Sequence, residues 1–260
     1  MKRFVLFGLV AGLALLVNSA WAVVVVDYKT GAILSGSATI GNASWVANED
    51  GNPWWDNRSA DTGGPNGNIG HVLTGVAVPG FSPNQLIPSP GNLPYLYDGS
   101  GPSADTKKAV VDWVFQDGLS VGLLRLELAG NRNFNEFGIY KAGDKNTKKK
   151  LFSGSDVPPK AVSFNPVADL GSTQFGLYMK YERDGSGWIF YSESKFNEYI
   201  GSQPSWWVDT VEQGYQHFAL FQGAWNGIGY RWWIGVEDKP YGNNPNENNP
   251  NNANRGDYQD

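Results

Sequence analysis

The sequence predicts an all-β protein, an antiparallel β-sandwich of jelly-roll-like form with a loop-rich N-terminal layer. Three observations indicate this fold. Glycine and proline are abundant, with 33 and 15 copies in 260 residues, and 14% of the residues are aromatic. No segment combines a 3.6-residue apolar period with a helix cap. Short runs rich in valine, isoleucine and aromatic residues recur instead between Gly, Asn, Asp and Pro, which is typical of strands joined by turns.

Eight such runs are predicted to be strands, and their spacing suits hairpins that build two packed sheets. In chain order they are Ala109–Phe115, Val121–Leu128, Phe137–Tyr140, Ala161–Phe164, Phe175–Tyr181, Trp188–Ser192, His217–Gln222 and Gly229–Val236. Within the second run, three leucines alternate with Arg125 and Glu127, as expected for a strand with one buried face. Gly185 and Gly187 indicate a hairpin turn between the fifth and sixth runs.

Two similar four-residue sequences and one lysine-rich run add detail to the predicted strands and loops. Phe137-Gly-Ile-Tyr140 and Phe175-Gly-Leu-Tyr178 resemble each other, and each is interpreted as a strand whose glycine lies where a neighbouring chain passes close. The run Lys145–Lys150 is interpreted as a solvated hairpin loop. The alternative for this run is a weak, salt-sensitive contact with anionic polysaccharide.

The N-terminus has the pattern of a secretory signal peptide over residues 1–22. Lys2 and Arg3 provide the positive start, Phe4–Val17 is almost wholly apolar, and Ala20-Trp21-Ala22 provides small residues at the cleavage site. The apolar run is shorter than the ~20 residues of a membrane-spanning helix. We therefore expect an exported, secreted protein that acts outside the cytoplasm. The alternative is an uncleaved N-terminal anchor.

Composition excludes several classes of function. The chain contains no cysteine, which excludes a disulfide framework, thiol catalysis and zinc–thiolate sites. Its two histidines are too few for a histidine-based metal cage. The formal net charge of −5 becomes more negative when Lys2 and Arg3 are removed, so nucleic acid is not an expected partner.

The mature chain divides into two predicted parts. Residues 23–107 form a loop-rich segment that packs on the sandwich, and residues 108–260 form the sandwich itself. Within the second part, Gly242–Gly256 is rich in asparagine and is expected to be irregular.

Three groups of motifs, taken in order, resemble a known family of exported proteins. The first group is Asn52-Pro-Trp-Trp-Asp-Asn57, Gly67-Asn-Ile-Gly70 and Leu73-Thr-Gly75. The second is Asn135-Glu-Phe-Gly-Ile-Tyr140, Leu151-Phe-Ser-Gly154, Phe175-Gly-Leu-Tyr178 and Phe190-Tyr-Ser-Glu-Ser-Lys-Phe-Asn197. The third is Gln216-His-Phe-Ala-Leu220, Ile234-Gly-Val-Glu-Asp238 and Gly256-Asp-Tyr-Gln-Asp260. Together they resemble bacterial PEP-CTERM-type proteins whose last domain is of the DUF4114 kind.

The resemblance implies a surface or extracellular-matrix protein associated with exopolysaccharide and biofilm. Two departures from the family pattern stand out. Arg255-Gly256 replaces the family's leading aspartate before Asp257, and the sequence stops at Asp260, before the family's closing strand and Pro-Glu-Pro sorting tail. We expect the chain to be truncated, which would leave an unpaired sheet edge. The alternative is a copy that is simply released.

Four acidic residues near the C-terminus are the candidate metal ligands: Glu237, Asp238, Asp257 and Asp260. The linker between the two pairs can loop back, and an oxygen-only ligand set favours Ca²⁺. The resemblance points the same way, because the family's acidic motif looks like a structural calcium site. The alternative is that one pair lies in a turn and the other in a frayed terminus, all of them solvated.

Adjacent tryptophan pairs are the candidate ligand-binding residues. Trp54, Trp55, Trp206 and Trp207 lie in polar, turn-rich sequence, where exposed rings could bind sugar faces. The pair at positions 232 and 233 is expected to fill the core instead. The alternative for every pair is that large aromatic side chains fill a disulfide-free sandwich.

No catalytic constellation stands out from the sequence. Glycoside hydrolysis needs two facing carboxylates, but nothing selects a pair among Glu127, Glu136, Glu182 and Glu193. The Gly-Ser-rich stretches at Ser35–Ser37 and Ser153–Ser155 are interpreted as loose turns, not as the Gly-x-Ser-x-Gly elbow of a serine hydrolase. His71 and His217 are both interpreted as structural. We therefore expect a non-enzymatic protein, with a lectin-like carbohydrate-binding module or a glycan hydrolase as the alternative.

Overall fold

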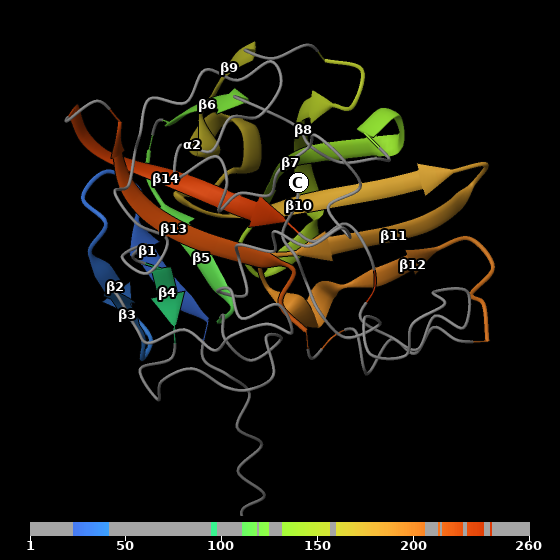
Figure 1. Cartoon of the computed structure of the whole chain (residues 1–260), viewed down its shortest axis with the longest axis horizontal. Helices are drawn as coiled ribbons and strands as arrows, with labels where there is room; N and C mark the ends of the chain where they lie inside the picture. Colours follow the sequence, from blue (N-terminus) through green and yellow to red (C-terminus); the bar gives the residue numbers. More distant parts are fainter. Residues whose placement is uncertain are drawn as a thin grey trace, which may run out of the picture.

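The computed structural model describes residues 23–41, 95–97, 111–118, 120–124, 132–156, 160–205, 213, 215–225, 228–236 and 240. Strands dominate this part of the chain, and the predicted all-β class is confirmed (Figure 1). Each of the eight predicted strands coincides with an observed one, although several boundaries differ by a few residues. The one α-helix of the described part is the short α2, Pro166–Leu170, which Asn165 caps at its N-terminus.

The larger sheet has eight strands, and most of it runs in the order β12-β11-β10-β5-β1-β2. The bounds of these six strands are Glu198–Ile200 for β12, Ser186–Tyr191 for β11, Gln174–Arg183 for β10, Trp113–Gln116 for β5, Val24–Asp27 for β1 and Ile33–Ser35 for β2. Strand β7, Asn135–Lys141, pairs with the other edge of β10 and with β8, Asp144–Ser153. Strands β1 and β5 are parallel, so the predicted purely antiparallel pairing is wrong at this position.

Two smaller sheets accompany it. The four-stranded sheet has the order β14-β13-β4-β3, with β14 at Ile228–Val236, β13 at Phe218–Trp225, β4 at Tyr95–Tyr97 and β3 at Thr39–Gly41. The two-stranded sheet pairs β6, Ser120–Leu124, with β9, Lys160–Phe164. Strands β1 to β4 come from the segment 23–107, so that segment contributes strands to both larger sheets.

The eight-stranded and four-stranded sheets contact each other through a shared hydrophobic core. Phe115 of β5 packs 5.4 Å from Trp232 of β14, between ring centroids, and Phe137 of β7 packs 6.4 Å from Phe218 of β13. Trp232 is partly buried against this core, as predicted, and its indole N–H donates to the carbonyl of Tyr28 at 2.8 Å. The two-sheet sandwich itself stays a prediction. The jelly-roll connectivity stays a prediction, because several connections lie outside the described residues.

The hairpin predicted from Gly185 and Gly187 is present between β10 and β11. Arg183 pairs with Ser186, which leaves a two-residue turn of Asp184 and Gly185. Both turn residues have positive φ, 54° and 77°, as the tight turns that match strand twist require.

The predicted close approaches at the two Phe-Gly-x-Tyr strings are also present. Gly138 lies directly opposite Tyr178, and Gly176 lies directly opposite Tyr140. A Cβ atom at Gly138 would lie 2.6 Å from Cε1 of Tyr178, which no real structure tolerates. Each glycine therefore makes room for the tyrosine ring of the neighbouring strand.

The interpretation of Lys145–Lys150 as a hairpin loop is wrong, because these residues form part of strand β8. Exposed and half-buried residues alternate along this stretch, since both of its faces reach solvent at the side of the sheet. Its lysines have partners in the fold. Lys145, Lys149 and Lys150 pair with Glu198, Asp169 and Glu136, and Lys148 lies 5.5 Å over the ring of Tyr178.

Candidate functional site

The most extensive polar cluster of the described chain lies where the eight-stranded sheet forks. Strand β5 pairs with the start of β10, and β11 pairs with the rest of the same edge. Ser192 bridges the gap between them. Its N–H donates to the carbonyl of Leu177 at 2.9 Å, its hydroxyl accepts from the Leu177 N–H at 3.0 Å, and its carbonyl accepts from the Trp113 N–H at 2.9 Å.

Gln216 satisfies the backbone groups that remain at this fork. Its amide nitrogen donates to the carbonyl of Ser192 at 2.8 Å, and its amide oxygen accepts from the N–H of Phe218, the first residue of β13, at 2.8 Å. Gln216 is only 3% exposed, so bulk water does not replace its amide as the partner of these two backbone groups. The side chain therefore connects the two larger sheets.

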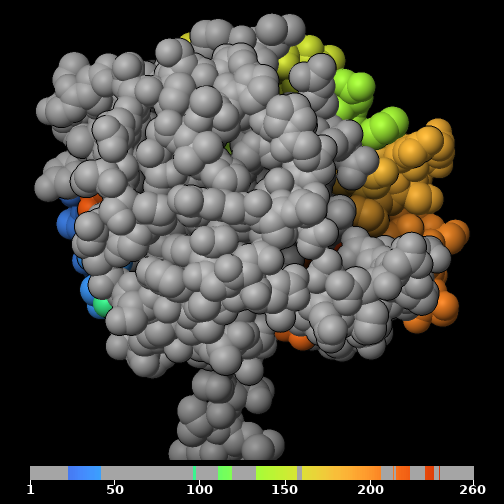
Figure 2. Space-filling view, in the orientation of Figure 1, coloured from blue at the N-terminus to red at the C-terminus, as the bar shows by residue number. Residues whose placement is uncertain are grey.

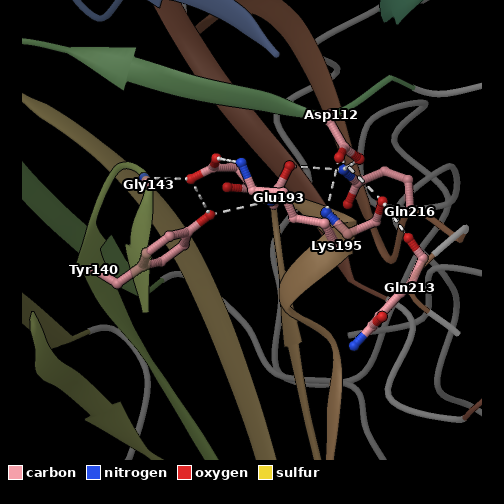
Figure 3. A network of polar contacts seen from close by, with 9 residues as sticks. Asp112, Tyr140, Gly143, Glu193, Lys195, Gln213 and Gln216 are labelled. Carbon is pink, nitrogen blue, oxygen red and sulfur yellow. Dashed lines mark hydrogen bonds and ion pairs between the residues drawn. The ribbon is translucent and has the colours of Figure 1, made fainter. Parts of the chain in front are cut away.

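Asp112 lies beside Gln216 and accepts three hydrogen bonds (Figure 3). The Ser194 N–H and hydroxyl each donate to one oxygen at 3.0 Å, and the amide of Gln216 donates to the other at 3.0 Å. Burial raises the pKa of the Asp112 carboxyl to about 6, the bonds from Ser194 lower it, and the charge of Glu193 raises it further.

Glu193 is the second carboxylate of the cluster and is only 3% exposed. One of its oxygens accepts from the Tyr140 hydroxyl at 3.0 Å and from the Gly143 N–H at 2.8 Å, and the other lies 2.9 Å from the ammonium of Lys195 (Figure 3). Gly143 belongs to the β7–β8 turn. Glu193 therefore fixes this turn to the sheet.

Three buried tyrosines extend the cluster across neighbouring strands. Tyr140, Tyr178 and Tyr191 belong to β7, β10 and β11, and together with Ile189 they form a second hydrophobic core. Their hydroxyls donate to Glu193 at 3.0 Å, Glu136 at 2.7 Å and Glu198 at 3.0 Å, in that order. Burial is the largest cause that raises the pKa of all three hydroxyls, so they stay protonated donors.

Each of the three glutamates also pairs with a lysine, namely Lys195, Lys150 and Lys145. Each carboxylate therefore accepts a hydrogen bond from a tyrosine hydroxyl at one oxygen and has an ammonium of opposite charge at the other. Chemically, this arrangement holds strands and turns together, and its carboxylates are already engaged by partners within the fold.

A second feature of interest is a row of aromatic side chains at the hairpin end of β10 and β11, a part of the sheet that reaches the surface in Figure 2. Tyr181 and Trp188 face each other across the strands with ring centroids 4.7 Å apart. Phe134, which is 39% exposed, packs edge-on against Tyr181, and the guanidinium of Arg183 lies 5.2 Å over its ring.

The residues predicted as sites from the sequence lie outside the described residues. This holds for the four acidic candidates Glu237, Asp238, Asp257 and Asp260, and for the candidate tryptophans Trp54, Trp55, Trp206 and Trp207. Within the described ranges, no group of three or more His, Asp or Glu side chains is arranged to hold a metal ion.

His217 fits the structural interpretation given to it. It is fully buried, and its ring stacks on Phe190 with a centroid distance of 3.5 Å and an interplanar angle of 6°. Of the acidic residues considered for glycoside hydrolysis, Glu136 and Glu193 bind tyrosine hydroxyls, and Glu182 pairs with Lys180.

Sequence reasoning missed Asp112, Ser192 and Gln216 as members of one cluster. The only available signal was that two of the quoted motifs, Phe190–Asn197 and Gln216–Leu220, contain polar residues next to strands. Nothing in either motif indicates that they meet each other.

No family model, no curated protein and no solved structure matches this chain. The resemblance to PEP-CTERM-type proteins therefore stays a prediction. Among the described residues there is no helix whose length and apolar character would let it cross a membrane.

Proposed function

We propose that the protein is a non-enzymatic, exported structural protein of the bacterial surface or extracellular matrix, associated with exopolysaccharide. The observation that best supports this proposal is that acidic side chains form hydrogen bonds and ion pairs within the fold. Glu136, Glu193 and Glu198 each bind a tyrosine and a lysine, and Asp112 binds two neighbouring segments. These carboxylates hold strands and turns of the eight-stranded sheet together.

The experiment is a binding and turnover assay on the mature chain, residues 23–260. The protein is applied to a panel of bacterial exopolysaccharides, and the bound glycan is analysed for shortened products. Binding or matrix retention without cleavage supports the proposal. Release of shortened oligosaccharides would place the protein among the glycan hydrolases instead.

Calcium is the cofactor that this proposal includes, held by the acidic residues after β14 and at the end of the chain. A bound ion would stabilise the fold by ~2.7 kcal/mol at a calcium concentration of 100 times Kd. Thermal melts with calcium and with EGTA test this, together with the variant Asp257→Asn. An EGTA-induced fall of the midpoint that the variant abolishes supports the site, and an unchanged midpoint in EGTA contradicts it.

A lectin-like function is the second candidate, and the aromatic row at the β10–β11 end favours it. Sugar rings present apolar C–H faces to aromatic side chains, and Phe134 and Arg183 are the exposed members of the row. In the same assay, Phe134→Ala and Arg183→Ala should weaken binding. Val167→Ala is the matched control, because Val167 is a 49% exposed apolar residue on α2. Equal binding by all three variants would exclude this row as the sugar contact.

A further inference from the structure

Asp112 lies at a junction of three segments that are distant in the sequence. It directly precedes β5, Ser194 follows β11, and Gln216 precedes β13. Strands β5 and β11 belong to the eight-stranded sheet, whereas β13 belongs to the four-stranded sheet. One carboxylate therefore connects both sheets at the fork.

The groups that donate hydrogen bonds to this carboxylate are neutral, and the repulsion from Glu193 outweighs the attraction from Lys195. The hydrogen-bond donors are the Ser194 N–H, the Ser194 hydroxyl and the Gln216 amide. The charged groups that act on Asp112 are Glu193, which repels it, and Lys195, whose ammonium contacts Glu193 at 2.9 Å. Asp112 is partly buried, and an anion that is partly withdrawn from water beside a like charge is unfavourable, a penalty that protonation removes.

We propose that Asp112 is an acid-strengthened clasp, which holds the two sheets together more firmly in mildly acidic surroundings than at neutral pH. The clasp does not depend on the proposed surface function, because it follows from the contacts of the fork alone. It would make an exported protein more resistant to opening where its surroundings become acidic.

The sign and size of the effect follow from the raised pKa of Asp112. Burial raises the pKa of Asp112 from 3.8 to about 6, so the folded protein binds this proton more tightly than the unfolded chain. Stability from this group is therefore greatest below the unfolded pKa and falls as the pH rises through about 6. Between pH 5 and pH 7, the folding equilibrium constant should fall about tenfold.

Urea unfolding of the mature chain at pH 5, 6 and 7 tests the clasp. The variant Asp112→Asn should lose the tenfold change, and the difference from wild type removes every contribution that the two proteins share, including those of the histidines. Asp184→Asn is the matched control, because the Asp184 side chain is 92% exposed, and it should follow wild type. Parallel pH profiles for wild type and Asp112→Asn would overturn the proposal.

A titration of the wild-type protein decides the question if Asp112→Asn fails to fold. The side-chain carboxyl carbons of ¹³C-labelled aspartate are followed by NMR from pH 3 to pH 8. A midpoint near 6 for Asp112, together with a protection factor of the Ser194 amide hydrogen, relative to its intrinsic exchange rate, that rises below that pH, supports the clasp. A midpoint near the ordinary aspartate value of ~3.9 contradicts it.

Discussion

Gly176→Ala should destabilise the protein far more than an ordinary surface substitution. A Cβ atom at this position would lie 2.5 Å from the hydroxyl oxygen of Tyr140 and even closer to its ring. The ring cannot turn aside easily, because Tyr140 is fully buried and packs edge-on against Tyr191 at 5.1 Å and Phe196 at 6.1 Å. The substitution therefore forces either the ring or strand β10 to move.

The expected loss can be worked out from two contributions. Overpacking in a closely packed site costs ~1–3 kcal/mol. A shifted ring also withdraws the Tyr140 hydroxyl from Glu193, with which it makes bonds of 3.0 and 3.1 Å, and a buried polar group left unsatisfied costs ~1–3 kcal/mol. Alanine restricts the unfolded chain and returns ~0.5 kcal/mol. We expect a net loss of about 3 kcal/mol in the free energy of unfolding.

Urea or guanidinium unfolding at pH 7 measures this loss. Gly118→Ala is the control, because Gly118 is exposed and a Cβ atom there would meet no atom within 4 Å. Its stability should stay within ~0.5 kcal/mol of wild type. In the double variant Gly176→Ala with Tyr140→Leu, removal of the ring should relieve the clash, so the combined loss is smaller than the sum of the single losses. Equal stability of Gly176→Ala and Gly118→Ala, or strict additivity in the double variant, would refute the reasoning.

Two further predictions concern the fork and the acid limit of the fold. Gln216→Ala leaves the Phe218 N–H without the amide oxygen that it binds and removes one donor to the Ser192 carbonyl, which keeps the Trp113 N–H; it should lower the free energy of unfolding by ~1–3 kcal/mol, and an effect below ~0.5 kcal/mol would show that water replaces the side chain. Hydrogen bonds from neighbouring residues lower the pKa of four aspartates, so their stabilisation is present above the unfolded value of 3.8 and is lost as the pH falls through their folded pKa values. These residues are Asp27, Asp144, Asp156 and Asp169. Because these four groups lose stabilisation at low pH and Asp112 loses it as the pH rises through about 6, we expect the highest melting temperature between about pH 4 and pH 6. A melting temperature that rises steadily from pH 4 to pH 8 would contradict this expectation.

Local sequence was sufficient to predict the long strands other than β8, because their pattern is local. Runs of aromatic and β-branched residues between turn residues predicted β7, β10, β11, β13 and β14. The short strands β1 to β4 and β12 were missed, since each has only three or four residues and pairs only because a distant strand lies beside it. The lysine run was assigned to a loop because its composition is polar. In the fold, both faces of this part of β8 reach solvent, and long charged side chains fit there.

The polar cluster could not be predicted, because its contacts are made between distant segments. Asp112 contacts Ser194 across 82 positions and Gln216 across 104. What makes these residues important is the fork itself, where two strands share one edge of β10 and leave backbone groups to be satisfied by side chains. Neither hydrophobic period nor turn chemistry carries information about such a fork.

The two Phe-Gly-x-Tyr strings connect the predictable part of the fold to the unpredictable part. Each string reads locally as a strand with a small residue. Because the two strings pair in β7 and β10, each tyrosine ring occupies the space beside the glycine of the neighbouring strand. Their hydroxyls then reach Glu193 and Glu136, and Glu193 acts on Asp112 at the fork. A pair of glycines therefore contributes to the electrostatics of the junction between the sheets, so Gly176→Ala should also change the pH at which Asp112 titrates.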